Sequence, residues 1–600
     1  MVSIAPGTEK VDLGPDWRTP AEASGYRSTP TYAETLGFLE RVAAARPDLV
    51  RLEAFGRTGE GRELKIVIAS GGGVFDPEAI RKLDRRVLLV QNCIHSGEPD
   101  GKDACLALLR DIVATDDREH LLEHVVLVFI PVYNIDGHER RSAFHRINQN
   151  GPELAGWRAN ATNLNLNRDY MKADAPETRA FLRLLQRWRP DFFVDDHVTD
   201  GADFQYDVTF ALDASPDVFP ATADWLRRTV TPEIVRQVNA AGHLAFPSAV
   251  FLNDDSDPSR GLAFNENPPR FSTGRMVLEN RPGLLVEMHM LKEYRTRVTG
   301  NYEVLRAVLK LMNRYATTLR VVNEDADAWA CRLGSGAARE RPFPLVVAKG
   351  GGSSSVSFRG LEYTREPSEV SGAMAIRYGA RPSEMTVPIS ADAEVVTAVK
   401  LPAGYIIPPQ WKHVVEVLEA QGVDLRRTSA EWTGRVERYR CSAMRWPSQP
   451  FEGRFPILRG GNVEHEFGHF GSCTLSLETL TFPARSIVVS LDQRLSKVAV
   501  HWLEPEAPDS ALRWGFFASV FEQKEAGEAY VLEKLAREEL AQDPSLKGEF
   551  EARVRSDPAF AGSPSARLGF FYERSPWGSA QRVGEYPVGR LLSVEGLPLE

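Results

Sequence analysis

A histidine and a glutamate lie three residues apart directly after the strongly apolar segment RVLLVQNCI. They are His95 and Glu98 of the sequence His-Ser-Gly-Glu, which Pro-Asp-Gly and a helical pattern follow. A catalytic zinc ion takes three protein ligands, such as neutral imidazoles and a carboxylate oxygen, and keeps one position open for water. A tight turn can bring this pair onto one ion. The short pattern also arises by chance in polar loops, so further residues must support it.

Two more polar residues stand at the ends of other apolar segments. His197 follows DFFVDD, and Glu287 is the fifth residue of GLLVEM. Functional groups of α/β sheets collect at the carboxyl ends of strands, and a buried carboxylate needs a compensating partner. We therefore expect His197 and Glu287 to join the same site. In isolation, a structural hydrogen bond would explain His197, and an ion pair with Arg295 or Arg297 would explain Glu287.

A polar stretch between these segments contains candidates for substrate binding. It includes Trp157-Arg158 and the run Asn-Leu-Asn-Leu-Asn-Arg-Asp-Tyr, which contains Asn167 and Arg168. An arginine in a tight polar turn is suited to bidentate recognition of a carboxylate.

The order of these motifs resembles the carboxypeptidase A family of zinc metallopeptidases. The order is His-x-x-Glu, then Asn-Arg, then a histidine at a strand end, then a glutamate at a strand end, and it spans about residues 30 to 320. The stretch PVYNIDG (131–137) is similar to the Asn-Pro-Asp-Gly turn of that family, with Ile135 where proline is usual.

The resemblance implies a metal centre and a mechanism. His95, Glu98 and His197 match the ligands of one zinc ion per chain, and Glu287 matches the general base that activates a water molecule. Zinc lowers the pKa of water toward about 7, so hydroxide can attack a polarised carbonyl without a covalent enzyme intermediate.

The resemblance also implies how a substrate is held. Asn167 and Arg168 match the pair that binds the terminal carboxylate of a peptide, and Arg158 matches the arginine that stabilises the oxyanion, at a shorter spacing than expected. The family's capping tyrosine is missing, because no tyrosine lies between Tyr206 and Tyr294. Either another residue caps the substrate or the pocket differs.

Apolar runs that alternate with helical patterns predict an α/β fold in the first half. We expect a mixed, mostly buried sheet with helices on both faces, as in carboxypeptidases. The segment ADAPETRAF predicts a helix start with Asp174 as its N-cap. The expected strands are 64–70, 86–94, 125–132, 191–196 and 283–288, and the clearest helices are 102–114 and 177–188.

The pattern changes near residue 320, where Gly/Ser clusters and strand-like stretches replace most helices. We expect a β-rich accessory region of the sandwich type, and an amphipathic helix over 525–542. The expected domains are an N-terminal extension (1–27), the catalytic domain (28–320), the β-rich accessory region (321–510) and a mixed region (511–600).

A second zinc signature, HExxH, occupies residues 465–469. On a helix it would set two histidines one turn apart with a glutamate base. Glycines flank it and alternating or β-branched residues follow, so a strand is favoured, on which His465 and His469 could not chelate in this manner. A polar β-rich surface is the better interpretation.

Bulk composition excludes several classes of protein. The net charge of -10 and the lack of a basic stripe argue against nucleic-acid binding. The five scattered cysteines indicate neither a disulfide framework nor a thiolate metal site. We expect a soluble protein, because the sequence shows no leader and no apolar run that could cross a bilayer. Cytoplasmic and secreted locations both stay open, as does the oligomeric state.

Three functions fit the sequence. The first is a zinc metallocarboxypeptidase that acts on peptides with a free C-terminus. The second is a zinc amidohydrolase that removes an acyl group from an amino acid or small peptide. The third is a non-catalytic protein that binds peptides or glycans, against which the complete set of metal ligands and base argues.

Overall fold

The structure is a computed structural model of the chain. It describes residues 17–114, 120–264, 267–352, 354–389, 393–457 and 472–600. The HExxH motif at 465–469 lies outside these residues.

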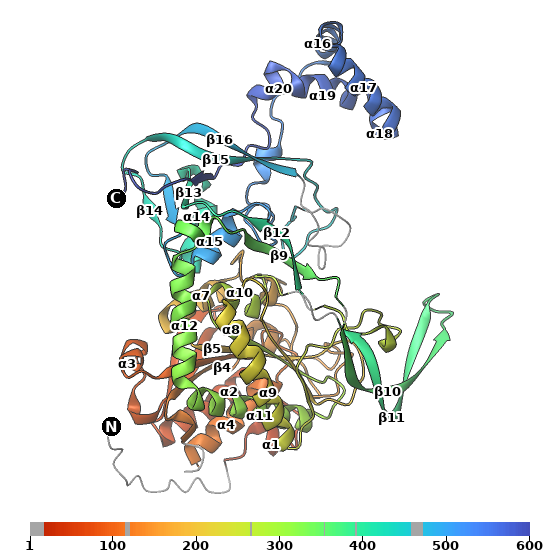
Figure 1. The fold of residues 1–600 in the computed structure, drawn as a ribbon. Helices are drawn as coiled ribbons and strands as arrows, with labels where there is room; N and C mark the ends of the chain where they lie inside the picture. Colours follow the sequence, from red (N-terminus) through yellow and green to blue (C-terminus); the bar gives the residue numbers. More distant parts are fainter. Residues whose placement is uncertain (1–16, 115–119, 265–266, 353, 390–392, 458–471) are drawn as a thin grey trace.

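An eight-stranded mixed sheet forms the centre of the first region (Figure 1). Its strand order is β1-β2-β4-β3-β5-β8-β6-β7, and the four central strands β4, β3, β5 and β8 run parallel. The remaining pairs are antiparallel apart from the parallel pair β6 and β7. The strands are β1 (Val50–Arg57), β2 (Glu63–Ala69), β3 (Arg86–Gln91), β4 (Val125–Ile130), β5 (Phe192–Val198), β6 (Val208–Leu212), β7 (Ala245–Phe246) and β8 (Gly283–Met288).

Helices cover both faces of this sheet, as predicted. Alternate residues of the central strands enter two separate apolar cores; for example, Leu88 belongs to one and Leu89 to the other. One core contains α2 (Tyr32–Ala45), α4 (Asp100–Ala114), α9 (Thr231–Ala240) and α11 (Tyr294–Arg314). The other contains residues of α3 (Pro77–Lys82), α7 (Pro176–Trp188) and α10 (Ser272–Leu278). Burial on both faces explains why these strands read as continuous apolar runs.

The five predicted strands and two predicted helices are all present, with ends shifted by a few residues. The sequence did not predict β1, β6 and β7. The predicted N-cap of α7 is wrong: the helix is capped at Ala175 without a side-chain bond, and Asp174 instead forms an ion pair with Arg454 of the second region. A partner 280 residues away has no local signature in the sequence.

Helix α12 (Ala316–Cys331) leads from the first region to a β-rich second region (Figure 1). Its main sheet has the strand order β14-β17-β13-β18-β15-β16. These strands are β13 (Gly404–Ile407), β14 (Arg426–Arg427), β15 (Trp432–Ser442), β16 (Ser472–Phe482), β17 (Ile487–Ser490) and β18 (Gly589–Leu591). Its apolar core includes α14 (Lys412–Gln421) and α15 (Ser496–Leu503), so helices pack on this sheet where a second sheet of a sandwich was expected.

Two parts of the second region project from its body (Figure 1). One is the antiparallel ribbon of β10 (Ser354–Pro367) and β11 (Met374–Ile389). The other is a group of helices: α16 (Ala529–Gln542), α17 (Pro544–Ser556), α18 (Pro558–Ala561), α19 (Pro564–Arg574) and α20 (Pro576–Ala580). A shorter pair, β9 (Phe343–Lys349) and β12 (Ala393–Val399), lies between the ribbon and the main sheet.

One disulfide corrects the expectation drawn from the cysteines. Cys441 and Cys473 lie opposite each other in the β15–β16 pair and are bonded. The pairing register of the strands brings them together across 32 residues of sequence, which spacing alone did not reveal. Among the described residues, no helix has the length and apolar character needed to cross a membrane.

Candidate active site

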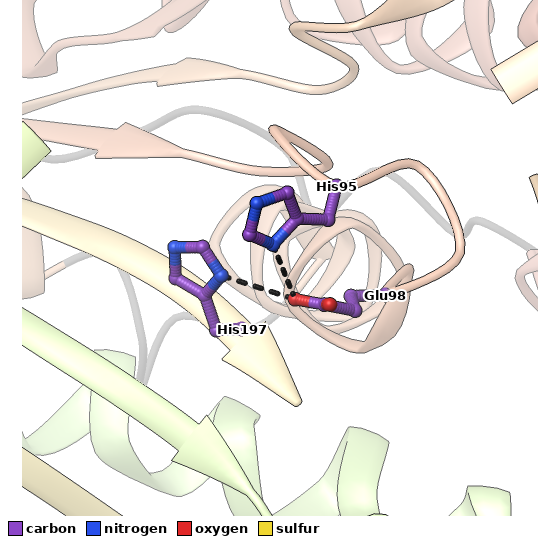
Figure 2. A group of neighbouring side chains, drawn as sticks. All are labelled: His95, Glu98 and His197. Atoms are coloured by element: carbon purple, nitrogen blue, oxygen red, sulfur yellow. Dashed lines mark hydrogen bonds and ion pairs between the residues drawn. The ribbon is translucent and has the colours of Figure 1, made fainter. Parts of the chain in front are cut away.

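Three buried side chains converge at the carboxyl edge of the large sheet (Figure 2). Glu98 lies between two imidazoles: its Oε2 is 3.3 Å from Nδ1 of His95 and 3.0 Å from Nδ1 of His197. One potential ligand atom from each residue lies within 4.8 Å of the others. The structure thus brings together the three residues that the sequence suggested as metal ligands.

The fold explains the convergence. Strands β3 and β5 are adjacent and parallel, so their carboxyl ends meet at one edge of the sheet. His95 follows β3 in a tight turn, closed by the Glu98 amide donating to the His95 carbonyl at 3.0 Å, and His197 is near the end of β5. Helix α4 begins two residues after Glu98 and fixes the end of this turn.

The protonation chemistry of these groups fits a metal ion. Burial, aided by Arg158, lowers the pKa of His95 to about 3, which keeps the imidazole neutral as a ligand requires. Burial alone would raise the pKa of Glu98, but His95 and Arg146 hold it well below its usual range. Burial alone would lower the pKa of His197, but Asp195 and Glu98 raise it well above its usual value, so a zinc ion would displace a proton from this ring. Two imidazoles and one carboxylate form the donor set of a catalytic zinc site.

A second group of residues orients the two histidines. Asp195 accepts from Nε2 of His197 at 2.9 Å, and Gln91 and Ser272 both donate to the same carboxylate. Oδ1 of Asn165 lies 3.0 Å from Nε2 of His95. Such partners fix the ring orientation of metal-binding histidines. The sequence analysis missed them, although Asp195 precedes His197 by two residues and therefore shares its strand face.

Glu287 lies beside His197. The two residues are direct register partners of β5 and β8, so their side chains share a face of the sheet. Oε2 of Glu287 is buried without a hydrogen-bond partner, and burial raises its pKa to about 8. Within the described residues no ion pair joins it to Arg297, which instead pairs with Asp100 at 3.2 Å.

Two arginines contact the outer oxygen of Glu98. Nη1 of Arg146 lies 3.1 Å from Oε1, and Nη1 of Arg158 lies 3.4 Å from it. Arg158 is the more exposed, at 38% of its side chain against 11% for Arg146. The turn at Asn134 positions Arg158, because the Asn134 amide donates to the Arg158 carbonyl at 3.1 Å. Arg146 was not predicted from the sequence.

Asn167 and Arg168 lie next to the same centre. Oδ1 of Asn167 accepts from the Ser272 amide at 3.0 Å, and its Nδ2 is 3.5 Å from Nε2 of His197. The Arg168 guanidinium stacks over Phe271, 4.3 Å from the ring centroid, and donates to the Asn167 carbonyl. All seven residues chosen from the sequence therefore lie at one edge of the sheet.

A turn of the second region also reaches this edge. In the turn Phe451-Glu452-Gly453-Arg454, Oε2 of Glu452 accepts from the Asn165 amide at 2.8 Å. Nε and Nη2 of Arg454 both donate to the Asp174 carboxylate, at 2.7 Å each. Glu452 and Gly453 have φ angles of 49° and 75°, as a tight two-residue turn requires. The accessory region is thus connected through Asn165 to His95.

Comparison with known proteins gives consistent matches. Residues 35–231 match the family model Peptidase_M14, described as zinc carboxypeptidase. Carboxypeptidase 2 of Trichophyton rubrum is 26% identical over 504 residues, which cover 81% of this chain and 84% of that one. Probable carboxypeptidase 2 of Arthroderma benhamiae is 26% identical over 442 residues, with coverages of 71% and 77%. The solved carboxypeptidase A of Helicoverpa armigera aligns at a TM-score of 0.36 and 16% identity, covering 50% of this chain and 78% of that one.

Proposed function

We propose that this chain, whose residues 35–231 match the zinc carboxypeptidase family model, is a metallocarboxypeptidase that removes C-terminal residues from peptides in a zinc-dependent reaction. His95, Glu98 and His197 would hold one zinc ion, and Glu287 would be the general base. The observation that carries the proposal is the convergence of the three donors beside a buried carboxylate oxygen that has no partner.

The chemistry follows from the positions of the side chains. A zinc ion on this donor set would supply an open position, a more acidic water molecule and polarisation of the scissile carbonyl. Glu287, whose unpartnered Oε2 lies beside His197, accepts the proton of the attacking water and passes it to the leaving amine. Arg158 donates to the developing oxyanion, and Asn167 and Arg168 bind the terminal carboxylate.

The direct test is the release of amino acids from a mixed peptide library, measured by mass spectrometry. Each peptide is present with a free and with an amidated C-terminus, with and without a zinc chelator. We expect trimming of the free peptides alone, abolished by the chelator. Hydrolysis of N-acyl amino acids without peptide trimming would favour the deacylase, and zinc binding with neither activity would refute hydrolysis.

Glu287→Gln tests the base separately from the metal. The amide keeps the shape of the side chain but cannot accept the proton, so we expect kcat to fall by about 10²–10⁴-fold. Zinc content, measured by mass spectrometry of the metal, should stay at one per chain. Glu233→Gln, on the exterior of α9 beside Arg236, is the matched control and should keep full activity. A fully active Glu287→Gln enzyme would end the proposed role.

A further inference from the structure

A cavity of about 390 Å³ lies between the two regions of the chain. The first region contributes Leu285 of β8 and the loop after β6, including Asp213 and Asp217. The second region contributes Val346 of β9 and His501 of α15. This volume is within the range of small-ligand pockets.

The cavity adjoins the proposed catalytic base. Leu285 precedes Glu287 by two residues, so both side chains leave the same face of β8, about 7 Å apart along the strand. Both are partly open, whereas Leu284, Val286 and Met288 between and beside them are buried in the core of the opposite face. A substrate whose scissile bond lies at Glu287 therefore has the cavity next to it.

The polar lining is rich in acceptors. Ser215 and Asn267 hold the Asp213 carboxylate, and Ser215 also donates to Asp217 at 2.5 Å, so the two carboxylates are close together. Burial and the neighbouring Asp217 raise the pKa of Asp213, as expected for two carboxylates held close together.

Two cations lie near these carboxylates. Lys497 is buried and donates to the Asp217 carbonyl at 3.4 Å, and Arg227, at the cavity, is paired with Asp224 at 3.0 Å. Among the described residues, three carboxylates (Asp213, Asp217 and Asp224) thus stand against the two cations Lys497 and Arg227. The local field therefore favours a third positive charge.

His501 provides an independent indication of a ligand. Its side chain is buried, with 2% of the residue exposed, yet neither ring nitrogen has a hydrogen-bond partner in the described structure. Burial lowers the pKa of His501 to about 4, so the ring is neutral near pH 7 and offers one acceptor nitrogen. Unpaired buried polar groups are costly, and a ligand with N–H donors would satisfy this one.

We propose that this cavity binds the side chain of the substrate's C-terminal residue and selects lysine or arginine. The inference rests on the proposed carboxypeptidase function. The apolar stem of the side chain lies against Leu285 and Val346, and its cationic head donates to Asp213, Asp217 and His501. A large apolar side chain would leave these acceptors dry and unpaired, and an acidic one would be repelled.

The test compares kcat/KM of the full-length, zinc-loaded enzyme on one peptide that ends in Lys, Arg, Leu, Ala or Glu. We expect Lys and Arg to exceed Leu by at least about tenfold. In the variant Asp213→Asn/Asp217→Asn, the Lys-to-Leu ratio should fall by at least about tenfold, because the carboxylate charges are lost. Glu233→Gln should leave the ratio unchanged.

A second variant tests the wall that the accessory region supplies. Val346→Phe narrows the cavity without changing charge, so the Lys-to-Ala ratio should fall while zinc content stays constant. If the double variant does not fold, Val346→Phe alone still tests whether the cavity binds the C-terminal side chain. Wild-type preference for Leu or Glu, or ratios unaffected by both variants, would overturn the cavity assignment but leave the peptidase function intact. An enzyme that cleaves none of the five peptides would overturn both.

Discussion

The two regions of the molecule differ in how deeply their charged side chains are buried. In the first region, the sheet is buried on both faces, and carboxylates such as Asp195 and Asp196 lie inside it with their partners. In the projecting parts of the second region, charged groups form exposed ion pairs such as Arg377 with Glu366. Titratable side chains that could take part in chemistry are therefore concentrated in the first region, where burial shifts their pKa values. The second region acts mainly through its contacts with the first.

Those contacts combine apolar packing, such as Phe204 against Phe358, with hydrogen bonds such as Gln421 to the Tyr170 carbonyl and with several ion pairs. Besides Arg454 with Asp174, the ion pairs include Arg270 with Asp509 at 3.0 Å and Arg494 with Glu279 at 2.6 Å. The contrast predicts large effects from changes at the metal centre, intermediate effects from its supporting residues and cross-region contacts, and negligible effects from the projecting parts.

The largest effect should follow Glu98→Gln. The substitution removes the one charged donor of the three, and we expect loss of stoichiometric zinc measured by mass spectrometry. Zinc supplies several kcal/mol of transition-state stabilisation, so turnover should fall by roughly 10³-fold or more. Retention of zinc and activity would show that the convergence of the three side chains is not the metal site.

Asp195→Asn should have a smaller effect. Three donors, from His197, Gln91 and Ser272, converge on this carboxylate, and an amide nitrogen would oppose one of them. Loss of such an outer partner typically lowers metal affinity by about 10–100-fold, which competition with a chelator can measure. Asp196→Asn is the matched control, because Asp196 faces the opposite side of β5 and binds Asn301. Equal losses in both variants would indicate a general structural defect.

The smallest measurable effect should come from the cross-region ion pair. Arg454→Ala leaves Asp174 partly buried without its fork, at a cost of about 1–3 kcal/mol in local stability. Because this contact holds the segment that carries Asn165 to Arg168, we expect KM to rise more than kcat falls. Arg377→Ala, in the exposed ribbon, should cost at most about 1 kcal/mol and leave both constants unchanged. Identical kinetics in the two variants would contradict a role for the accessory region at the site.

The sequence predicted those features that depend on local pattern. Buried parallel strands read as apolar runs, and polar residues near their ends, such as His197 and Glu287, indicated the edge of the sheet where the candidate site lies. The short strands β6 and β7 and the half-exposed β1 carry no such run. Asp195 and His197 are two residues apart in one strand, so the sequence itself indicated that Asp195 could bind and orient the His197 ring.

Long-range contacts could not be predicted in this way. The Glu452 contact with Asn165 spans 287 residues, and the disulfide of Cys441 and Cys473 depends on strand register. The cavity beside Leu285 likewise exists only once both regions are packed. The domain boundaries proposed at residues 27, 320 and 510 remain a proposal, although the second main sheet draws strands from 404 to 591.

The turn at Glu452 and Arg454 has a consequence for synthesis on the ribosome. Domains fold from the N-terminus as the chain emerges, so the large sheet can form long before its partner turn exists. Arg454 is made 280 residues after Asp174, a delay of roughly 15–60 s at about 5–20 residues per second. During that interval the nascent chain lacks the contact that secures its candidate substrate-binding segment, and the proposed peptidase activity is expected only when translation has passed the turn.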